Sequence, residues 1–203
     1  MGGEMTDMVK FGTLDRRAAV SELLKDRGPL LVVTGLGSSS YDAFAAGDHE
    51  ANFYLWGAMG GAAVMGLGLA LAQPKRPVCV LTGDGEQLMG LGALATIAAK
   101  KPANLSIVVL DNGHFGETGM QISHSGLGVD LHRIAEAAGF AATAEMRDLE
   151  GIAAYRAQLM KTKGGPRFAT IRIAPGSPPR ALPARDGVFL KNRFRQNLGF
   201  GVN

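Results

Sequence analysis

Two short apolar runs, each followed at once by a polar turn, constrain this chain most. Val78–Thr82 and Leu105–Leu110 are rich in Val, Leu and Ile, as expected of strands buried on both faces of a sheet. Glu86–Lys100 between them is long enough for a crossover helix, so the two strands can lie parallel. We predict an α/β fold with a doubly wound, mostly parallel sheet and helices on both faces.

The turns after these strands carry oxygen ligands. The first strand runs into Gly83–Gly85 (Gly-Asp-Gly) and the second into Asp111–Gly113 (Asp-Asn-Gly). Ligands of doubly wound sheets bind at the carboxyl ends of strands, where Asp84 and Asn112 would meet. Their oxygens suit a hard cation such as Mg²⁺, with phosphates completing its shell. Gly-Asp-Gly alone is also a common strand-to-helix turn, but the second turn at this spacing favours a metal site.

The rest of the chain predicts the remaining scaffold of one domain over residues 1–203. Helices are expected over Thr13–Asp26, Asp130–Ala138 and Asp148–Lys161, and further strands over Leu30–Val33 and Phe168–Ile173. The tail, residues 175–203, is rich in Pro and Arg and is expected to be either a short helix packed on a neighbour or a solvated segment.

Composition excludes several classes of protein. The 46% hydrophobic content and 29 glycines fit a tightly packed core, and the net charge of +3 forms no basic stripe for nucleic acid. The single cysteine, Cys79, argues against a disulfide framework and an iron–sulfur subunit. Gly57–Ala72 is uncharged but short and glycine-rich, which predicts a buried helix rather than a membrane span. Met1–Lys10 lacks the apolar core of a secretory signal, so we expect a cytoplasmic protein.

The two turns at this spacing resemble the signature of thiamine diphosphate enzymes. In that family the Asp of Gly-Asp-Gly, the second residue of the later pair and a main-chain carbonyl two residues on bind the metal. The resemblance therefore implies Asp84, Asn112 and the carbonyl of His114 as Mg²⁺ ligands. The family often has Asn-Asn where this chain has Asp111-Asn112, which leaves the ligand position itself intact.

A second segment, Asn52–Gly60 (NFYLWGAMG), is similar to the part of the family that grips the aminopyrimidine ring. The resemblance makes Met59 the wedge that bends the cofactor, and the carbonyl of Gly57 the acceptor for its 4′-amino group. A flexible thioether packs well in such a gap, although Met59 as ordinary core is the alternative.

The resemblance also assigns the neighbouring loops. The glycines and serines after the first strand would touch the diphosphate, although a helix N-cap explains the serines nearly as well. The wall of the active site would begin after the metal loop, where His114 is alternatively a loop residue that matters through its main chain alone. The expected catalytic residues are Met59, His114, Glu117 and Thr118. The expected cofactor contacts are Gly37, Ser38, Ser39, Gly57, Ala58, Met59, Gly83, Asp84, Gly85, Glu86, Asn112, His114 and Phe115.

From about Leu14 to Gly199 the chain resembles the sulfopyruvate and phosphonopyruvate decarboxylase group, in particular its sulfopyruvate decarboxylase beta subunits. This implies a Mg²⁺- and thiamine diphosphate-dependent lyase that converts sulfopyruvate to sulfoacetaldehyde and CO₂. In the family the glutamate beside N1′ of the pyrimidine belongs to another domain. The resemblance thus implies a hetero-oligomer completed by a pyrimidine-binding alpha subunit, with no membrane partner.

Two other interpretations stay open at this point. The same fold serves other thiamine reactions, such as carboligation or decarboxylation of phosphonopyruvate or another small anionic 2-oxoacid. A cofactor-binding subunit without turnover is the third interpretation, and the paired Asp84 and Asn112 disfavour it. The sequence does not select the acid, because similar donors bind sulfonate, phosphonate and carboxylate groups.

Overall fold

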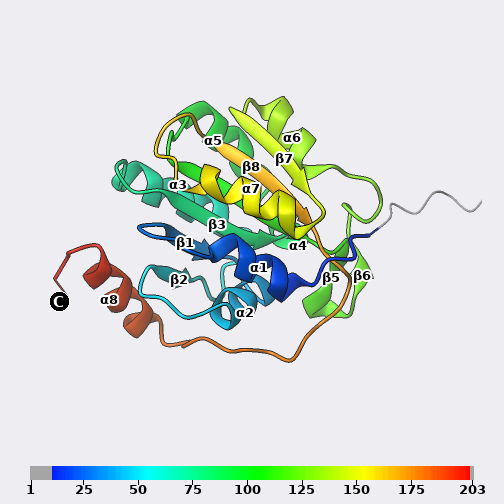
Figure 1. Cartoon of the computed structure of the whole chain (residues 1–203), viewed down its shortest axis with the longest axis horizontal. Helices are drawn as coiled ribbons and strands as arrows, with labels where there is room; N and C mark the ends of the chain where they lie inside the picture. Colours follow the sequence, from blue (N-terminus) through cyan, green and yellow to red (C-terminus); the bar gives the residue numbers. More distant parts are fainter. Residues whose placement is uncertain (1–10, 202–203) are drawn as a thin grey trace, which may run out of the picture.

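A six-stranded parallel sheet forms the centre of the molecule, in the order β2-β1-β3-β4-β8-β7. The computed structural model describes residues 11–201, so the stretch in which no secretory signal was expected lies outside the described residues. The predicted α/β sheet is confirmed (Figure 1). Its strands are β1 (Leu31–Thr34), β2 (Asn52–Tyr54), β3 (Val78–Gly83), β4 (Leu105–Asp111), β7 (Ala142–Met146) and β8 (Arg167–Arg172).

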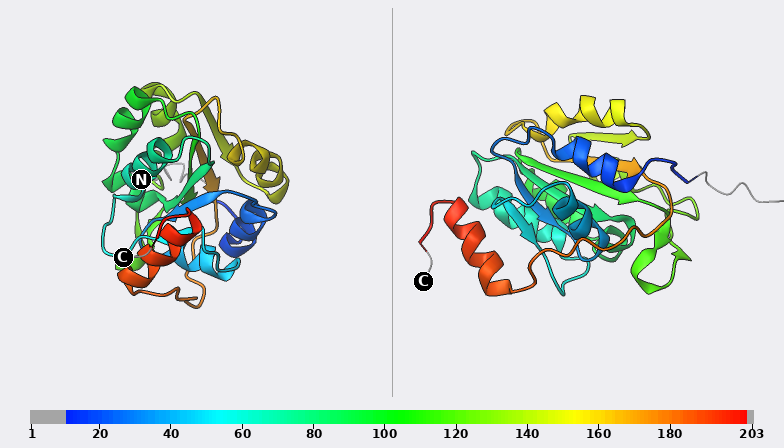
Figure 2. Two further views of the ribbon diagram at one scale, coloured as in Figure 1. Left: turned by 90° about the vertical axis from the view of Figure 1, so that its left-hand side faces the viewer. Right: turned by 60° about the horizontal axis from the view of Figure 1, so that its bottom comes forward.

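Helices cover both faces of the sheet (Figures 1 and 2). One face packs against α1 (Arg16–Leu24), α2 (Ser38–Ala45) and α7 (Leu149–Leu159). The other packs against α3 (Ala62–Ala72), α4 (Asp84–Met89), α5 (Ala93–Lys100) and α6 (Leu131–Ala138). The last helix, α8 (Gly187–Asn197), lies beside the edge strand β2. None of the helices that the structure describes is both long and apolar enough to cross a membrane.

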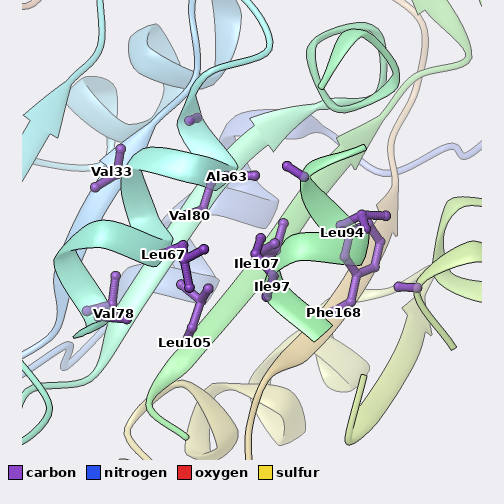
Figure 3. Close-up of a cluster of buried hydrophobic side chains, with 14 of the residues drawn as sticks. Val33, Ala63, Leu67, Val78, Val80, Leu94, Ile97, Leu105, Ile107 and Phe168 are labelled. Carbon is purple, nitrogen blue, oxygen red and sulfur yellow. The ribbon is translucent and has the colours of Figure 1, made fainter. Parts of the chain in front are cut away.

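Alternate residues of the central strands enter two separate cores, because successive side chains of a strand point to opposite faces. Val80 and Ile107 pack with Leu67 of α3 and Ile97 of α5 in the first core (Figure 3). Cys79 lies in the second core, where burial raises the pKa of its thiol to about 12. Cys79 is therefore a buried, protonated core residue.

The crossover between β3 and β4 differs from the predicted single helix over Glu86–Lys100. It is divided into α4 and α5 at residues 90–92. A Cβ on Gly90 would lie 2.2 Å from the carbonyl oxygen of Gly60, so the two backbones touch. Only glycine permits this approach, and the break brings the start of the crossover beside the loop that carries Met59.

A similar cause shortens the helix predicted over Gly57–Ala72. It begins only at Ala62, because Gly57 and Gly60 take φ angles of 73° and 85° that do not continue a helix. The other three predicted helices are present with shorter bounds. Each begins after an aspartate N-cap whose side chain accepts a backbone N–H, at Asp15, Asp130 and Asp148.

The sequence reasoning missed the short β elements and left the tail open. Besides β2 and β7, it missed a hairpin of β5 (His114–Phe115) and β6 (Gln121–Ile122). In the tail, α8 packs on its own chain: the rings of Phe194 and Phe53 lie 5.6 Å apart, edge to face. The solvated alternative for this part of the tail is therefore wrong.

Asn104 generates a testable prediction for the fold. Its buried side-chain nitrogen lies 3.2, 3.0 and 2.7 Å from the carbonyl oxygens of Ala70, Gln73 and Arg76, and its two N–H groups are shared among them, which ties the end of α3 to the start of β4. Asn104→Ala should lower the free energy of unfolding in urea by about 2 kcal/mol, since buried acceptors lose their donor. Asn104→Asp should cost more, because a carboxylate repels the carbonyls. Losses below about 0.5 kcal/mol in both variants would contradict this account.

Candidate functional site

A cavity opens at the carboxyl edge of the sheet, and the two predicted turns meet in it. Parallel pairing of β3 with β4 places Gly83 beside Leu110, so the residues that follow each strand lie close together. Asp84 and Asn112 both line the cavity. The structure therefore brings together the two residues that the sequence proposed as metal ligands.

Most of the other predicted site residues lie in the same lining. They are Ser38, Ser39, Met59, Gly83, Gly85, Glu86, His114, Phe115, Glu117 and Thr118. Gly37, Gly57 and Ala58 do not contribute to it, although Gly37 lies against the side chain of Glu117. Arg16 lines the cavity and was missed by the sequence reasoning.

Asp84 is a buried carboxylate held by two serines. Its Oδ2 accepts hydrogen bonds from Ser123 and Ser125 at 2.5 and 2.9 Å, and Oδ1 has no side-chain donor among the described residues. Burial, and secondly the charge of Asp111, raise the pKa of Asp84 to about 6. Among residues 11–201 the carboxylate thus has no cationic partner, which is the state expected of a ligand for an external cation.

Asp111 fixes the conformation of the Asp111–Gly113 turn through buried hydrogen bonds and an ion pair. Its Oδ1 accepts from the backbone of Gly113 at 2.9 Å and lies 2.7 Å from the hydroxyl of Ser125, whose single proton is shared between Asp111 and Asp84. Its Oδ2 accepts from Arg172 at 2.7 Å, and the same guanidinium donates to Glu145 at 2.9 Å. The Asp that departs from the family's Asn-Asn pair is therefore a buried, ion-paired support for the metal loop.

Ser123, Ser125 and Arg172 contact the carboxylates of Asp84 and Asp111, and the sequence patterns did not indicate these contacts. Ser123 and Ser125 lie far from Asp84 in sequence and reach it only because the β5–β6 hairpin folds back. Arg172 pairs with Asp111 across β4 and β8. An arginine at the end of the last predicted strand, opposite an unusual aspartate, was the available signal for that pair.

The metal loop itself is closed by local hydrogen bonds. The Oδ1 of Asn112 accepts from the backbone of His114 at 2.9 Å, and the Nδ1 of His114 lies 2.7 Å from the carbonyl of Asn112. The imidazole is half-buried and packs at 4.7 Å from the ring of Phe11. His114 therefore contributes a fixed side chain to the wall of the cavity as well as its main chain.

Met59 is 42% exposed and lines the cavity, so the alternative of a core methionine is wrong. Its loop is held by Glu86, whose Oε1 accepts from the backbone of Ala62 at 3.1 Å. Burial raises the pKa of Glu86. Its Oε2 lies against the backbone of Gly35, and a Cβ built on Gly35 would be only 2.0 Å from this oxygen. The carboxylate thus joins α4 to the start of α3, which follows the loop that carries Met59.

The first turn of α2 faces the same cavity through two serines. Its N-cap, Gly37, has no side chain to satisfy the free N–H groups of the helix. The hydroxyl of Ser38 donates to Glu117 at 3.2 Å and that of Ser39 to the carbonyl of Gly35 at 3.0 Å. The serines are therefore not N-caps, and the uncapped N–H groups suit an anion.

The donor set fits a metal-bound diphosphate with an attached ring. A carboxylate and an amide oxygen suit Mg²⁺, and the uncapped first turn of α2 suits phosphate oxygens. The exposed thioether of Met59 supplies an apolar surface beside them. Glycine at position 85 leaves the room that Phe115 fills, since a Cβ there would lie 2.7 Å from its ring.

Comparison with known proteins agrees with this geometry. Residues 36–171 match the family model of the thiamine pyrophosphate enzyme C-terminal TPP-binding domain. The chain is 38% identical over 164 residues to the sulfopyruvate decarboxylase subunit beta of Methanothermobacter thermautotrophicus, which covers 81% of this chain and 84% of that protein. It is 42% identical over 163 residues to the phosphonopyruvate decarboxylase of Streptomyces hygroscopicus, covering 80% of this chain but only 40% of that protein.

A solved structure shows the same fold. The X-ray structure of a protein from Mycobacterium smegmatis, titled as a thiamin diphosphate-dependent enzyme, superimposes with a TM-score of 0.68 at 24% identity. The match covers 87% of this chain and 35% of that one. The family match spans more than half of the chain and includes both turns of the cavity. The chain therefore belongs to the thiamine pyrophosphate enzymes, as their C-terminal TPP-binding domain.

Proposed function

We propose that this chain is the metal- and diphosphate-binding subunit of a thiamine diphosphate-dependent 2-oxoacid decarboxylase. Asp84, Asn112 and the carbonyl of His114 hold Mg²⁺, and the first turn of α2 with the Gly83–Gly85 turn receives the diphosphate. The observation that carries the proposal is the meeting of Asp84 and Asn112 in one cavity that also exposes Met59. Bound thiamine diphosphate supplies the electron sink for loss of CO₂.

The residues of this chain bind and orient the cofactor and form part of the wall around the substrate. Met59 sets the bend of the cofactor, and Glu86 fixes the Met59 loop through the backbone of Ala62. His114 and Glu117 form the wall on the other side of the cavity. Because Nδ1 of His114 faces the carbonyl of Asn112, only the doubly protonated imidazolium would have an Nε2 proton to donate to the anionic substrate. Water is excluded only when a second subunit covers the exposed Met59 side. A separate pyrimidine-binding subunit, with its glutamate, therefore completes the site in a hetero-oligomer.

Sulfopyruvate is the proposed substrate, with sulfoacetaldehyde and CO₂ as products. The support is 38% identity to a sulfopyruvate decarboxylase beta subunit, in a match that covers 84% of that relative. Phosphonopyruvate is the second candidate, favoured by 42% identity to a decarboxylase of which the chain spans less than half. Specificity constants of the reconstituted pair for sulfopyruvate, phosphonopyruvate and pyruvate decide between them. A higher value for phosphonopyruvate would reverse the assignment.

Asp84→Asn should raise the stability of the metal-free protein and weaken metal binding. At pH 7 and without metal, the free energy of unfolding of the variant should be about 2 kcal/mol higher than that of wild type, because a buried carboxylate of pKa about 6 is replaced by a neutral amide. Since the folded-state pKa of Asp84 is raised, wild type takes up a proton and gains stability as the pH falls through roughly 6 to 4. The advantage of the variant therefore shrinks at pH 5.

Urea unfolding with and without Mg²⁺ and thiamine diphosphate measures both effects. Wild type should be stabilised by the two ligands together, since they bind the native state. Asp84→Asn should lose this stabilisation. An Asn variant that keeps the full ligand-dependent increase in unfolding free energy would remove Asp84 from the metal site.

Met59→Ala should slow turnover of the reconstituted enzyme by about tenfold or more, because the cofactor is no longer held in its reactive shape. The free energy of unfolding should change by less than about 0.5 kcal/mol, since the side chain is exposed. Met89→Ala is a matched control, because Met89 is 66% exposed and lies outside the cavity lining. Equal kinetic effects in the two variants would refute the wedge.

The 203-residue chain should be catalytically silent by itself, because the proposal places the glutamate beside N1′ on the partner. Adding the pyrimidine-binding subunit should produce decarboxylation, measured as CO₂ release from sulfopyruvate. A Glu→Gln change of that glutamate should abolish it. Sustained turnover by the purified chain, with the partner shown absent by mass spectrometry, would overturn the two-subunit site.

A further inference from the structure

Arg16 is a buried cation at the cavity that nothing in the proposed site uses. It occupies the first position of α1, and its side chain is 9% exposed. Its Nε donates to Asp42 at 2.6 Å, which fixes the guanidinium beside α2. Asp42 is the only acceptor that the described residues give it, so the remaining N–H donors are available to a ligand.

The charges around the cavity show what that ligand must be. Among the described residues, the lining holds three carboxylates, on Asp84, Glu86 and Glu117, and one guanidinium, that of Arg16. Glu117 is already paired with Arg180 at 3.2 Å, and Glu86 is directed to α3. A diphosphate retains net negative charge after it binds Mg²⁺ beside Asp84. Arg16 is the one guanidinium among the described lining residues. Its Nε is paired with Asp42, and its terminal N–H groups can still donate to phosphate oxygens.

We propose that Arg16 is a binding residue for the diphosphate, acting together with the uncapped first turn of α2. This inference rests on the proposed function and adds a cationic donor to it. Arg16 and Ser38 line the same cavity, and α1 and α2 pack against one another. Guanidinium–phosphate hydrogen bonds are charge-assisted and often bidentate, so a prepositioned arginine adds both affinity and orientation. Asp42 is the positioning residue that holds this arginine.

Arg17 is a matched control on the same helix turn. It lies 3.9 Å from Asp42 and donates to the carbonyl of Pro179. It contributes to a second, smaller hollow, which Arg16 also lines, but not to the cavity of Asp84. Arg17→Gln therefore removes the same charge from the same surface while leaving the cavity lining intact.

Calorimetric titration of the full chain with inorganic pyrophosphate in excess Mg²⁺ tests the inference, because this probe needs only the half-site in this subunit. Arg16→Gln should weaken binding by about tenfold or more, Arg16→Lys by less, and Arg17→Gln by less than about twofold. Arg16→Gln binding as tightly as wild type would overturn the role of Arg16. Asp84→Ala should abolish binding, and wild type that fails to bind would overturn the proposed function itself.

Two further experiments distinguish a folding defect from a binding defect, and binding of the diphosphate from binding of the 2-oxoacid. If Arg16→Gln alone does not fold because Asp42 loses its partner, the variant R16Q/D42N removes both charges and should fold but bind pyrophosphate weakly. Wild-type affinity in that variant would refute the inference. In the reconstituted enzyme, Arg16→Gln should raise the Kd for thiamine diphosphate. A raised KM for the 2-oxoacid with unchanged pyrophosphate affinity would assign Arg16 to the substrate instead and overturn the diphosphate assignment.

Discussion

The parallel pairing of β3 with β4 is the constraint on which the site depends. It places Gly83 beside Leu110, so the turns that follow end at one edge although a whole crossover separates them in sequence. Each strand is buried on both faces, which fixes the register. A shift of one residue would move every core side chain to the opposite face and separate Asp84 from Asn112. The same register of β3 and β4 is therefore required both for burial of the core side chains and for the geometry of the site.

The site holds negative charge away from water, which opposes folding. Asp84 has serine hydroxyls but no ion pair within the part of the chain that the structure describes, and burial raises its pKa to about 6. Asp111 is different, since Arg172 holds it from the next strand. One buried carboxylate is thus compensated within the protein while its neighbour is left for an external cation. This division of roles explains why an aspartate is compatible with the position before Asn112.

Local patterns were enough to predict a parallel sheet, four of its six strands and both turns, because each depends on residues that are close in sequence. The strands β2 and β7 were not predicted, and Met59 was assigned to the site by the family resemblance alone. The chain's own contacts decided the rest. The break between α4 and α5 follows from backbone contact of Gly90 with Gly60, which no local pattern encodes. Arg16 and Ser123 join the site through packing of α1 and folding of the hairpin. Long-range contacts of this kind are invisible to periodicity and spacing.

The central claim is that Asp84 and Asn112 hold a divalent metal with the diphosphate between β3, β4 and α2. The most direct measurement is an anomalous difference map from crystals grown with Mn²⁺ and thiamine diphosphate. The account predicts one strong peak at roughly 2.2 Å from an oxygen of Asp84 and of Asn112, with the diphosphate completing the shell. A metal peak elsewhere, with a cavity free of the diphosphate, would contradict the account.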